Sequence, residues 1–217
     1  MFVAYIGAMD VEVDAIIKSL KDVKKEEYRG FSFYVGKRGD NTIVVSTSGI
    51  GKVNAAVTAT VLLDKYHVDY VINAGIAGSV DTLIGTICVA DILKYHDVYC
   101  PGYEGLPRGP KDFRPSAQIL SQAKTILKDK VLFGTFLSGD QFIEKVEDLH
   151  NASLNGVVAV DMESAAIAQV CYLFSTDFLI IRTISDNLSN KEATENENEA
   201  SKNSFNAVVN FIDNYKF

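Results

Sequence analysis

Short apolar runs alternate with segments in which apolar residues recur every three or four positions. Val13, Ile16, Ile17 and Leu20 share this helical spacing, whereas residues 2–6 are apolar throughout and end at a glycine, as buried strands do. These patterns predict strands at residues 2–6, 31–35, 42–46, 70–73, 86–93, 131–137, 157–160 and 178–184, and helices after Asp10 and at residues 52–66, 116–128, 162–174 and 200–215. Strands and helices interleave without a linker or repeat, so we expect residues 1–217 to form a single three-layer α/β domain.

The composition narrows the class of partner. The 217 residues include 28 Asp and Glu against 21 Lys and Arg, a net charge of −7. This balance argues against nucleic acid and anionic membranes as partners, because both need clustered basic side chains. No apolar run reaches the roughly 18 residues that cross a bilayer, and the first ten residues lack the pattern of a secretion signal.

The cysteines indicate a compartment. Cys88, Cys100 and Cys171 are dispersed and form no C-x-x-C pair, as expected of reduced thiols. We therefore expect a soluble cytoplasmic protein that acts on a small molecule.

Two segments depart from the alternation of strands and helices. All four prolines lie between residues 101 and 115 with three glycines, in a loop long enough to be functional or mobile. Residues 186–199 are mostly polar and carry four glutamates. A solvated loop or the start of a helix is the simpler interpretation of the second segment, and a lid over a substrate is the alternative.

Several common motifs are incomplete. The turn that ends in Gly51 and Lys52 is similar to a phosphate-binding loop, but that motif would need glycine at Ser46 and a hydroxyl at Val53. The glycines after residues 70–73 lack the first glycine of a dinucleotide fingerprint. The three histidines are scattered, and neither H-E-x-x-H nor G-x-S-x-G occurs, so a zinc site and a serine triad are unsupported.

Carboxylates recur where predicted strands end and helices begin. Glu12 and Glu163 each lie in a predicted first helical turn, after caps at Asp10 and Asp161, and Asp186 ends an apolar strand. Ligands bind at the carboxyl ends of strands in open α/β sheets, so the three acids could meet in one crevice. The structural alternative is that helix dipoles favour acids at helix N-termini, and that Asp186 pairs with the nearby Arg182.

Eight segments, in their order along the chain, carry a resemblance: Ile6-Gly-Ala-Met-Asp-Val-Glu-Val13, Ser48-Gly-Ile-Gly-Lys-Val53, Asn73-Ala-Gly-Ile-Ala-Gly78, Tyr95-His-Asp97, Gly102-Tyr-Glu-Gly-Leu-Pro107, Ser138-Gly-Asp-Gln-Phe-Ile143, Val160-Asp-Met-Glu163 and Arg182-Thr-Ile-Ser-Asp186. Together they resemble the nucleoside phosphorylase/hydrolase superfamily. The resemblance implies a three-layer α/β/α sandwich with a central twisted mixed β-sheet. It also implies hydrolysis of the N-glycosidic bond of 5′-methylthioadenosine and S-adenosylhomocysteine, with 5′-deoxyadenosine as a further candidate, and no metal or cofactor.

The resemblance also implies roles for particular residues. Glu12 would be the general base that activates water against the anomeric carbon, and Asp186 would protonate or hydrogen-bond purine N7, so that adenine leaves neutral. Glu163 would accept hydrogen bonds from the ribose hydroxyls and favour positive charge on the sugar. Phe142 would stack on adenine, although a lone phenylalanine is more often core. The other residues implied to bind substrate are Met9, Ile50, Gly78, Ile143, Met162, Arg182 and Ser185.

Departures from the family pattern bear on the nucleophile and on the walls of the site. Phosphate-using relatives surround the sugar with arginines, but residues 73–78 contain none and acids crowd the first strand-to-helix turn, which favours water. Relatives often carry serine where Ile76 stands, which leaves Glu12 and Arg182 to hold the water. The loop at residues 98–110, which in relatives reaches the neighbouring subunit's site, is shorter than usual. Residues 192–199 replace a segment with paired phenylalanines that closes over the site.

Other functions remain open from the sequence. They are a nucleosidase for another purine nucleoside, such as a futalosine-type substrate, a nucleoside phosphorylase, a nucleoside-binding module without turnover and, more remotely, a nucleotide-dependent oxidoreductase. For an assembly we expect a homodimer, with the apolar helix at residues 52–66 as the candidate interface. The expected partner is a small nucleoside rather than nucleic acid or membrane.

Overall fold

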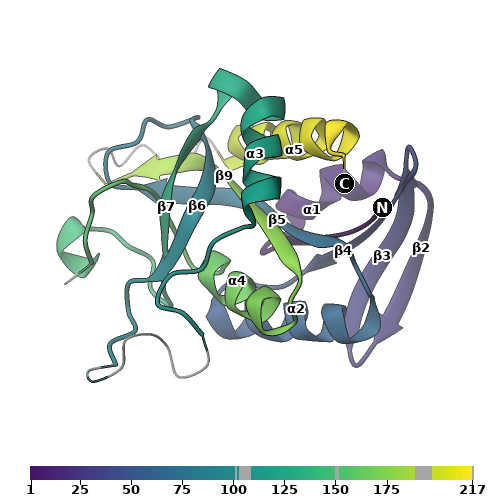
Figure 1. Ribbon diagram of the computed structural model, residues 1–217, viewed down its shortest axis with the longest axis horizontal. Coiled ribbons are helices and arrows are strands. Elements are labelled where there is room, and N and C mark those ends of the chain that lie inside the picture. Colours follow the sequence, from purple (N-terminus) through teal and green to yellow (C-terminus); the bar gives the residue numbers. More distant parts are fainter. Residues whose placement is uncertain (101, 103–108, 150–151, 189–196, 217) are drawn as a thin grey trace.

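A helix-covered mixed sheet organises the chain in the computed structural model, which describes residues 1–100, 102, 109–149, 152–188 and 197–216 (Figure 1). Within these residues, nine strands follow the order β2-β3-β4-β1-β5-β8-β7-β6-β9. The strands are β1 Phe2–Gly7, β2 Lys21–Tyr28, β3 Phe31–Arg38, β4 Asn41–Thr47, β5 Tyr70–Ser79, β6 Ile87–Tyr95, β7 Leu132–Ser138, β8 Val157–Asp161 and β9 Asp177–Asn187. The α-helices are α1 Asp10–Ser19, α2 Lys52–Lys65, α3 Ala117–Leu127, α4 Ser164–Leu173 and α5 Glu197–Asn214, and short 3₁₀ turns span Lys128–Lys130 and Val146–Leu149.

Strand β5 is the centre of the sheet. It runs parallel to β1 and β9, so the carboxyl ends of these three strands lie at one edge. Strand β8 runs antiparallel to β5 and meets it at Gly78 and Val160, near the carboxyl ends of both. Because β9 pairs with β6 as well as with β5, the strands β5, β8, β7, β6 and β9 close into a ring of pairings. The pairings of β5 with β1, β8 and β9 bring the carboxyl ends of these four strands close together.

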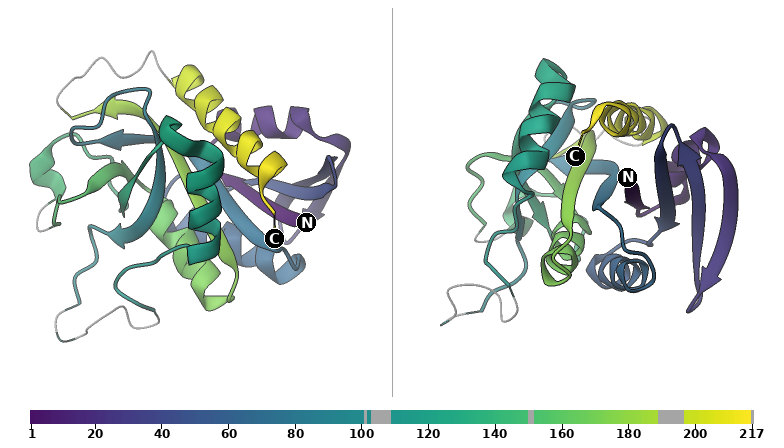
Figure 2. Two further views of the ribbon diagram at one scale, coloured as in Figure 1. Left: turned by 45° about the horizontal axis from the view of Figure 1, so that its top comes forward. Right: turned by 45° about the vertical axis from the view of Figure 1, so that its right-hand side comes forward.

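Helices cover both faces of the sheet. Figures 1 and 2 show α3 and α5 on one side and α2 and α4 on the other. The apolar faces of α1, α3 and α5 pack on one buried cluster, which contains Ile16, Ile119 and Phe211. The second cluster takes its side chains from α2, α4 and the opposite sheet face. The predicted three-layer α/β/α architecture with a mixed sheet is confirmed.

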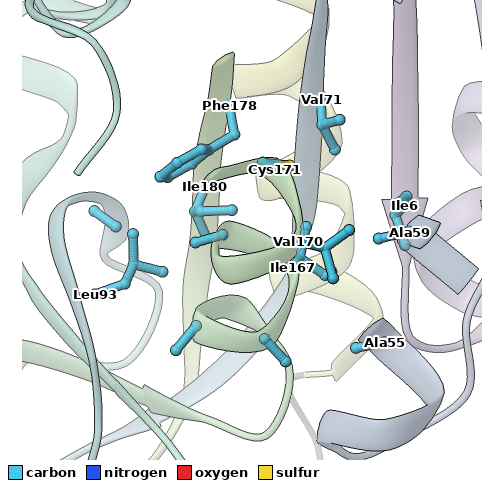
Figure 3. Close-up of a cluster of buried hydrophobic side chains, with 14 of the residues drawn as sticks. Ile6, Ala55, Ala59, Val71, Leu93, Ile167, Val170, Cys171, Phe178 and Ile180 are labelled. Carbon is cyan, nitrogen blue, oxygen red and sulfur yellow. The ribbon is translucent and has the colours of Figure 1, made fainter. Parts of the chain in front are cut away.

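Helix α4 shows why its sequence is apolar on nearly every side. It packs between the sheet and α2, and Figure 3 shows Ile167, Val170 and Cys171 of α4 in the cluster that also contains Ala59 of α2 and Ile180 of β9. Each large aliphatic side chain buried in this way stabilises the fold by roughly 1.5–3 kcal/mol. The N-terminus of α4 is thereby fixed next to the end of β8.

Strand β2 was not predicted. Its sequence Lys-Asp-Val-Lys-Lys-Glu-Glu-Tyr is mostly charged and exposed, so it carries no burial signal. It pairs antiparallel with β3 at the edge of the sheet, where charged side chains discourage pairing with another chain. The two strands predicted at residues 31–35 and 42–46 therefore belong to a three-stranded antiparallel meander with β2.

The cap of α1 also differs from the prediction. Asp10 is the first helical residue rather than the cap, and the cap position is held by Met9. The Glu12 side chain reaches back to the Met9 N–H instead. At α4 the cap position is held by Glu163 rather than by the predicted Asp161, although Asp161 Oδ1 accepts from the Ser164 N–H at 3.2 Å.

The predictions about the proline-rich loop and about the acidic segment concern residues that the structure describes only in part. Residues 103–108 of the proline-rich loop and residues 192–196 of the acidic segment lie outside the described residues. Among the described helices, none combines the length and apolarity that a membrane crossing requires.

Candidate active site

A cavity of about 270 Å³ opens where β1, β5, β8 and β9 end. It is lined by Ala8, Met9, Glu12, Ile50, Ile76, Ala77, Gly78, Ser79, Gln141, Phe142, Ile143, Val160, Asp161, Met162, Glu163, Ser185, Asp186 and Leu188. Ten of the eleven predicted site residues are among them, and Arg182 is the exception. The side chains that line the cavity are mainly apolar and small, and a few carboxylates converge on it, as is usual in a site that binds a small molecule.

Glu12 is held by backbone donors from two elements. Its Oε2 accepts from the N–H groups of Ala8 (2.7 Å) and Met9 (3.1 Å), and its Oε1 accepts from the N–H of Ile76 (2.9 Å). The side chain is buried. Three neutral donors satisfy and orient a carboxylate without an ion pair, so Glu12 is presented to the cavity in a fixed position.

Glycines make room for the acids. A Cβ on Gly75 would overlap Glu12 Oε1, so β5 must carry glycine where α1 brings its carboxylate against the strand. A Cβ on Gly78 would lie 2.7 Å from Asp186 Oδ2. The two glycines of β5 therefore set how closely both carboxylates approach the strand.

Glu163 lies at the start of α4 in a more charged setting. Its Oε1 accepts from the Gly51 N–H at 2.8 Å, and its Oε2 is 3.7 Å from Nη2 of Arg182. Burial, reinforced by the adjacent charge of Asp161, raises the pKa of Glu163 to about 7, although Arg182 opposes the shift. At neutral pH this carboxyl is therefore divided between its two protonation states.

Arg182, which the resemblance implies to bind substrate, lies beneath the cavity and not in its lining. Its side chain is only 1% exposed, its Nε donates to Asp161 Oδ2 at 3.0 Å, and its Nη2 donates to Asn73 Oδ1 at 2.8 Å. The alternative pairing with Asp186 is also wrong, since the carboxylates that Arg182 meets in the described structure are those of Asp161 and Glu163. Arg182 therefore supports the wall of the cavity from behind, through its contacts with Asp161 and Glu163.

Asp161 has a larger part than the cap that the sequence predicted. Besides Arg182, it accepts from the hydroxyls of Ser138 (2.6 Å) and Ser164. These bonds tie β7, β8, β9 and α4 together under the cavity. An acid directly after a buried strand was the available signal, but its arginine partner comes from a distant segment.

The other end of the cavity carries Asp186 and Phe142. Asp186 Oδ1 accepts from the Ser185 hydroxyl at 2.8 Å, and both residues lie where β9 ends. Phe142 is 68% exposed, so it is not the core residue that its type would favour, whereas Ile143 is buried beside Leu137 and Val160. Several other residues line the cavity, such as Ala77, Val160 and Leu188. They could not be predicted from the sequence as site residues, because small and aliphatic side chains give no chemical signal.

Metal ligands do not gather in this part of the protein. Across the described ranges, no group of three or more His, Cys, Asp or Glu is arranged to hold a metal ion. The site presents its chemistry through carboxylates, backbone N–H groups and one exposed aromatic ring.

The family follows from comparison with known proteins. Residues 2–213 match the model of the phosphorylase superfamily, and the chain belongs to this family. A 5′-methylthioadenosine/S-adenosylhomocysteine nucleosidase from Colwellia psychrerythraea is 37% identical over 97% of this chain and 95% of its own length. The crystal structure of a nucleosidase of this kind from the same organism, in complex with adenine, has a TM-score of 0.90 and covers 98% of this chain and 95% of that one.

A second kind of enzyme has the same fold. The structure of a futalosine hydrolase mutant from Helicobacter pylori has a TM-score of 0.90 at 26% identity, covering 99% of this chain and all of that one. The lower identity separates it from the Colwellia protein, which is 36% identical as a structure.

Proposed function

We propose that this protein hydrolyses the N-glycosidic bond of 5′-methylthioadenosine and S-adenosylhomocysteine, releasing adenine and the thioribose product, with 5′-deoxyadenosine as a further candidate substrate. The observation that carries the proposal is the meeting of Glu12, Glu163 and Asp186 around one cavity. The 37% identity to a nucleosidase over nearly the whole chain supports the same reaction.

The geometry suits a reaction in which positive charge develops on a sugar. Glu12 takes a proton from the attacking water, and Asp186 delivers a proton to, or hydrogen-bonds, purine N7, so that the bond to adenine breaks with a neutral leaving group. Glu163 accepts from the ribose hydroxyls, and its charge favours the oxocarbenium-like transition state. The proton that Glu12 gains balances the one that Asp186 gives to the purine.

The purine and sugar walls follow from the same arrangement. Phe142 stacks on adenine while the backbone of Ile143 meets the edge of the ring. The sugar side is lined by Met9, Ile50, Gly78 and Met162, with Ser185 holding Asp186. Arg182 acts on this site through Asp161 and Glu163.

Water is favoured over phosphate as the nucleophile. In the described part of the chain the cavity lining contains no lysine or arginine, whereas it contains Glu12, Asp161, Glu163 and Asp186. A phosphate anion would meet carboxyl groups there and no cationic side chain of the described lining, whereas a neutral water molecule would not be repelled. This distribution supports a hydrolase and argues against a phosphorylase.

We further propose a cytoplasmic homodimer that pairs through α2. One face of this helix packs on the core, and the other presents Val53, which is 71% exposed, and Val57. With Ile50 at the cavity rim, these side chains form an exposed apolar strip that a second copy would cover. All three cysteines are free, in keeping with a reducing compartment.

Adenine release tests the proposal. Purified protein is mixed with 5′-methylthioadenosine in phosphate-free buffer, and adenine is followed by chromatography. We expect release without phosphate and no acceleration when phosphate is added. Release that requires phosphate would make the protein a phosphorylase, and binding without release would make it a nucleoside-binding module.

A further inference from the structure

Three residues from separate segments form a charged cluster beside the cavity. Nζ of Lys52 donates to both carboxylate oxygens of Asp97 at 2.7 Å and lies 3.8 Å from Oδ2 of Asp140. The Asp140 N–H donates to Asp97 Oδ2 at 2.9 Å. We call these residues the Lys52–Asp97–Asp140 cluster.

The cluster joins the start of α2 to the segment that carries Phe142. The Lys52 N–H donates to Asp140 Oδ1 at 2.7 Å, and the Gly51 N–H before it donates to Glu163 Oε1 at 2.8 Å. Two successive N–H groups at one helix N-terminus thus bind two carboxylates, which the helix dipole favours. One carboxylate belongs to the ribose side, and the other directly precedes residues 141–143 of the purine side.

Lys52 supplies the charge that lets two acids lie side by side. Its side chain is only 19% exposed and rests 5.2 Å over the ring of Tyr95, so it is held in one place. Burial raises the pKa of Asp97, but the hydrogen bonds from Lys52 and from the Asp140 N–H, together with the charges of Lys52 and His96, outweigh it, and the pKa is lowered overall. Without the ammonium group, Asp97 and Asp140 would repel each other and the Asp140 turn would lose its anchor.

We propose that the Lys52–Asp97–Asp140 cluster is a positioning device that sets the purine-side segment at residues 141–143 against the Glu163 side of the cavity. The proposal rests on the proposed function for its kinetic consequences. It assigns a role to the Gly-Ile-Gly-Lys turn at residues 49–52, which is not a phosphate-binding loop. The lysine side chain of this turn contacts the carboxylates of Asp97 and Asp140 instead.

The kinetic consequence is specific. Contacts of residues 141–143 with the purine are made in both the ground state and the transition state, so weakening them raises KM more than it lowers kcat. Glu12 and Asp186 are held by other partners and keep their geometry. A residue that served stability alone would lower Tm and leave KM unchanged.

The test compares Lys52→Met with Lys65→Met. Lys65 lies on the same helix, is similarly exposed at 21%, donates to Glu26 at 2.6 Å and lies 4.8 Å over a tyrosine ring, but it is remote from the cavity. For Lys52→Met we expect KM for 5′-methylthioadenosine to rise about tenfold with kcat within about threefold. Lys65→Met should leave both constants as in the wild type, and Lys52→Arg should restore part of the lost affinity.

Asp140→Ala is a second variant that tests the proposal even if Lys52→Met does not fold. Asp140 is about half exposed, so its removal should be tolerated, and we expect the same rise in KM. Unchanged KM in both Lys52→Met and Asp140→Ala, or an equal rise in Lys65→Met, would overturn the proposal.

Adenine affinity, measured by calorimetry, separates this proposal from the proposed function. If the wild type released no adenine, the nucleosidase proposal would fail, but the adenine Kd of wild type and Lys52→Met would still decide the role of the cluster. We expect a Kd about tenfold weaker in the variant. Equal Kd values, or no binding of adenine by the wild type, would contradict it.

Discussion

The β1–α1 and β8–α4 junctions use the same residue in contrasting ways. Each brings a glutamate to the start of a helix at the carboxyl edge of the sheet, and each glutamate is buried. Glu12 is surrounded by three backbone N–H donors and no ion pair is formed with it in the described structure. Glu163 has the Gly51 N–H, the nearby charge of Asp161 and the guanidinium of Arg182.

This difference separates orientation from charge. Neutral donors hold the Glu12 side chain in one orientation at the cavity, which suits the general base that we propose. Glu163 lies among charges that partly cancel, and its pKa is raised into the physiological range. The local sequence pattern is alike at both junctions; the partners from β5, α2 and β9 make them different.

Replacing the base should have the largest effect. For Glu12→Gln we expect kcat to fall about 10³-fold, because the amide cannot take the proton from water, while affinity for 5′-methylthioadenosine stays within about threefold. Steady-state adenine release gives kcat, and calorimetry gives the affinity. A variant with wild-type kcat would show that Glu12 is not the base.

Crowding the base without removing it should come next. Gly75→Ala places a methyl group on Glu12 Oε1, and displacement of the carboxylate should lower kcat/KM about 10²-fold. Gly134→Ala is the control. Its added Cβ would crowd Val158, which does not line the cavity, so this variant should have a lower Tm and little change in kcat/KM. Equal activities of the two variants would argue against fixed placement of Glu12.

The second carboxylate should affect binding more than chemistry. Glu163→Gln keeps the shape of the side chain but loses the charge that accepts from the ribose hydroxyls, so we expect KM to rise about tenfold with a smaller fall in kcat. Initial rates over a range of 5′-methylthioadenosine concentrations separate the two constants. A variant that lost kcat as severely as Glu12→Gln would remove the contrast between the junctions.

The smallest expected effect is on pH dependence. Because burial raises the pKa of Glu163 from 4.5 to about 7, the ionised form that binds ribose increases as pH rises, and KM should fall severalfold across about pH 6 to 8. The same shift means that the stabilising contribution of neutral Glu163, complete below its unfolded pKa, is lost as pH rises through about 7.

Asp161→Asn sharpens that pH test. Removing the neighbouring charge should lower the pKa of Glu163 and move the midpoint of the KM profile to lower pH. KM profiles recorded at constant ionic strength for the wild type and the variant give the comparison. A midpoint that stays in place would assign the titration to another group.

The fold could be predicted where burial leaves a pattern in the sequence. The strands of the core and the helices α2 and α4 bury apolar side chains, so their runs and repeats were visible. Strand β2 buries almost nothing and exists because β3 offers it hydrogen-bond partners. Pairing of this kind leaves no trace in local composition.

The carboxyl groups that line the candidate site could be predicted, but the residues that hold them in place could not. Glu12, Glu163 and Asp186 stood out because ligands bind at the carboxyl ends of strands in open α/β sheets and because the family pattern coincides with these acids. The burial of Arg182 beneath Asp161, and the meeting of Lys52 with Asp97, depend on residues at least 21 positions apart along the chain. Such contacts follow from the closed sheet rather than from spacing.

The identity of the sugar product tests the central claim most directly. Wild-type protein is incubated with 5′-methylthioadenosine in buffer that contains phosphate, and the sugar product is identified by its mass in a mass spectrometer. An acidic cavity that activates water through Glu12 predicts free 5-methylthioribose. A sugar 1-phosphate would contradict the account, because it would show that the anion enters a site in which we find negative charge alone among the lining side chains of the described residues.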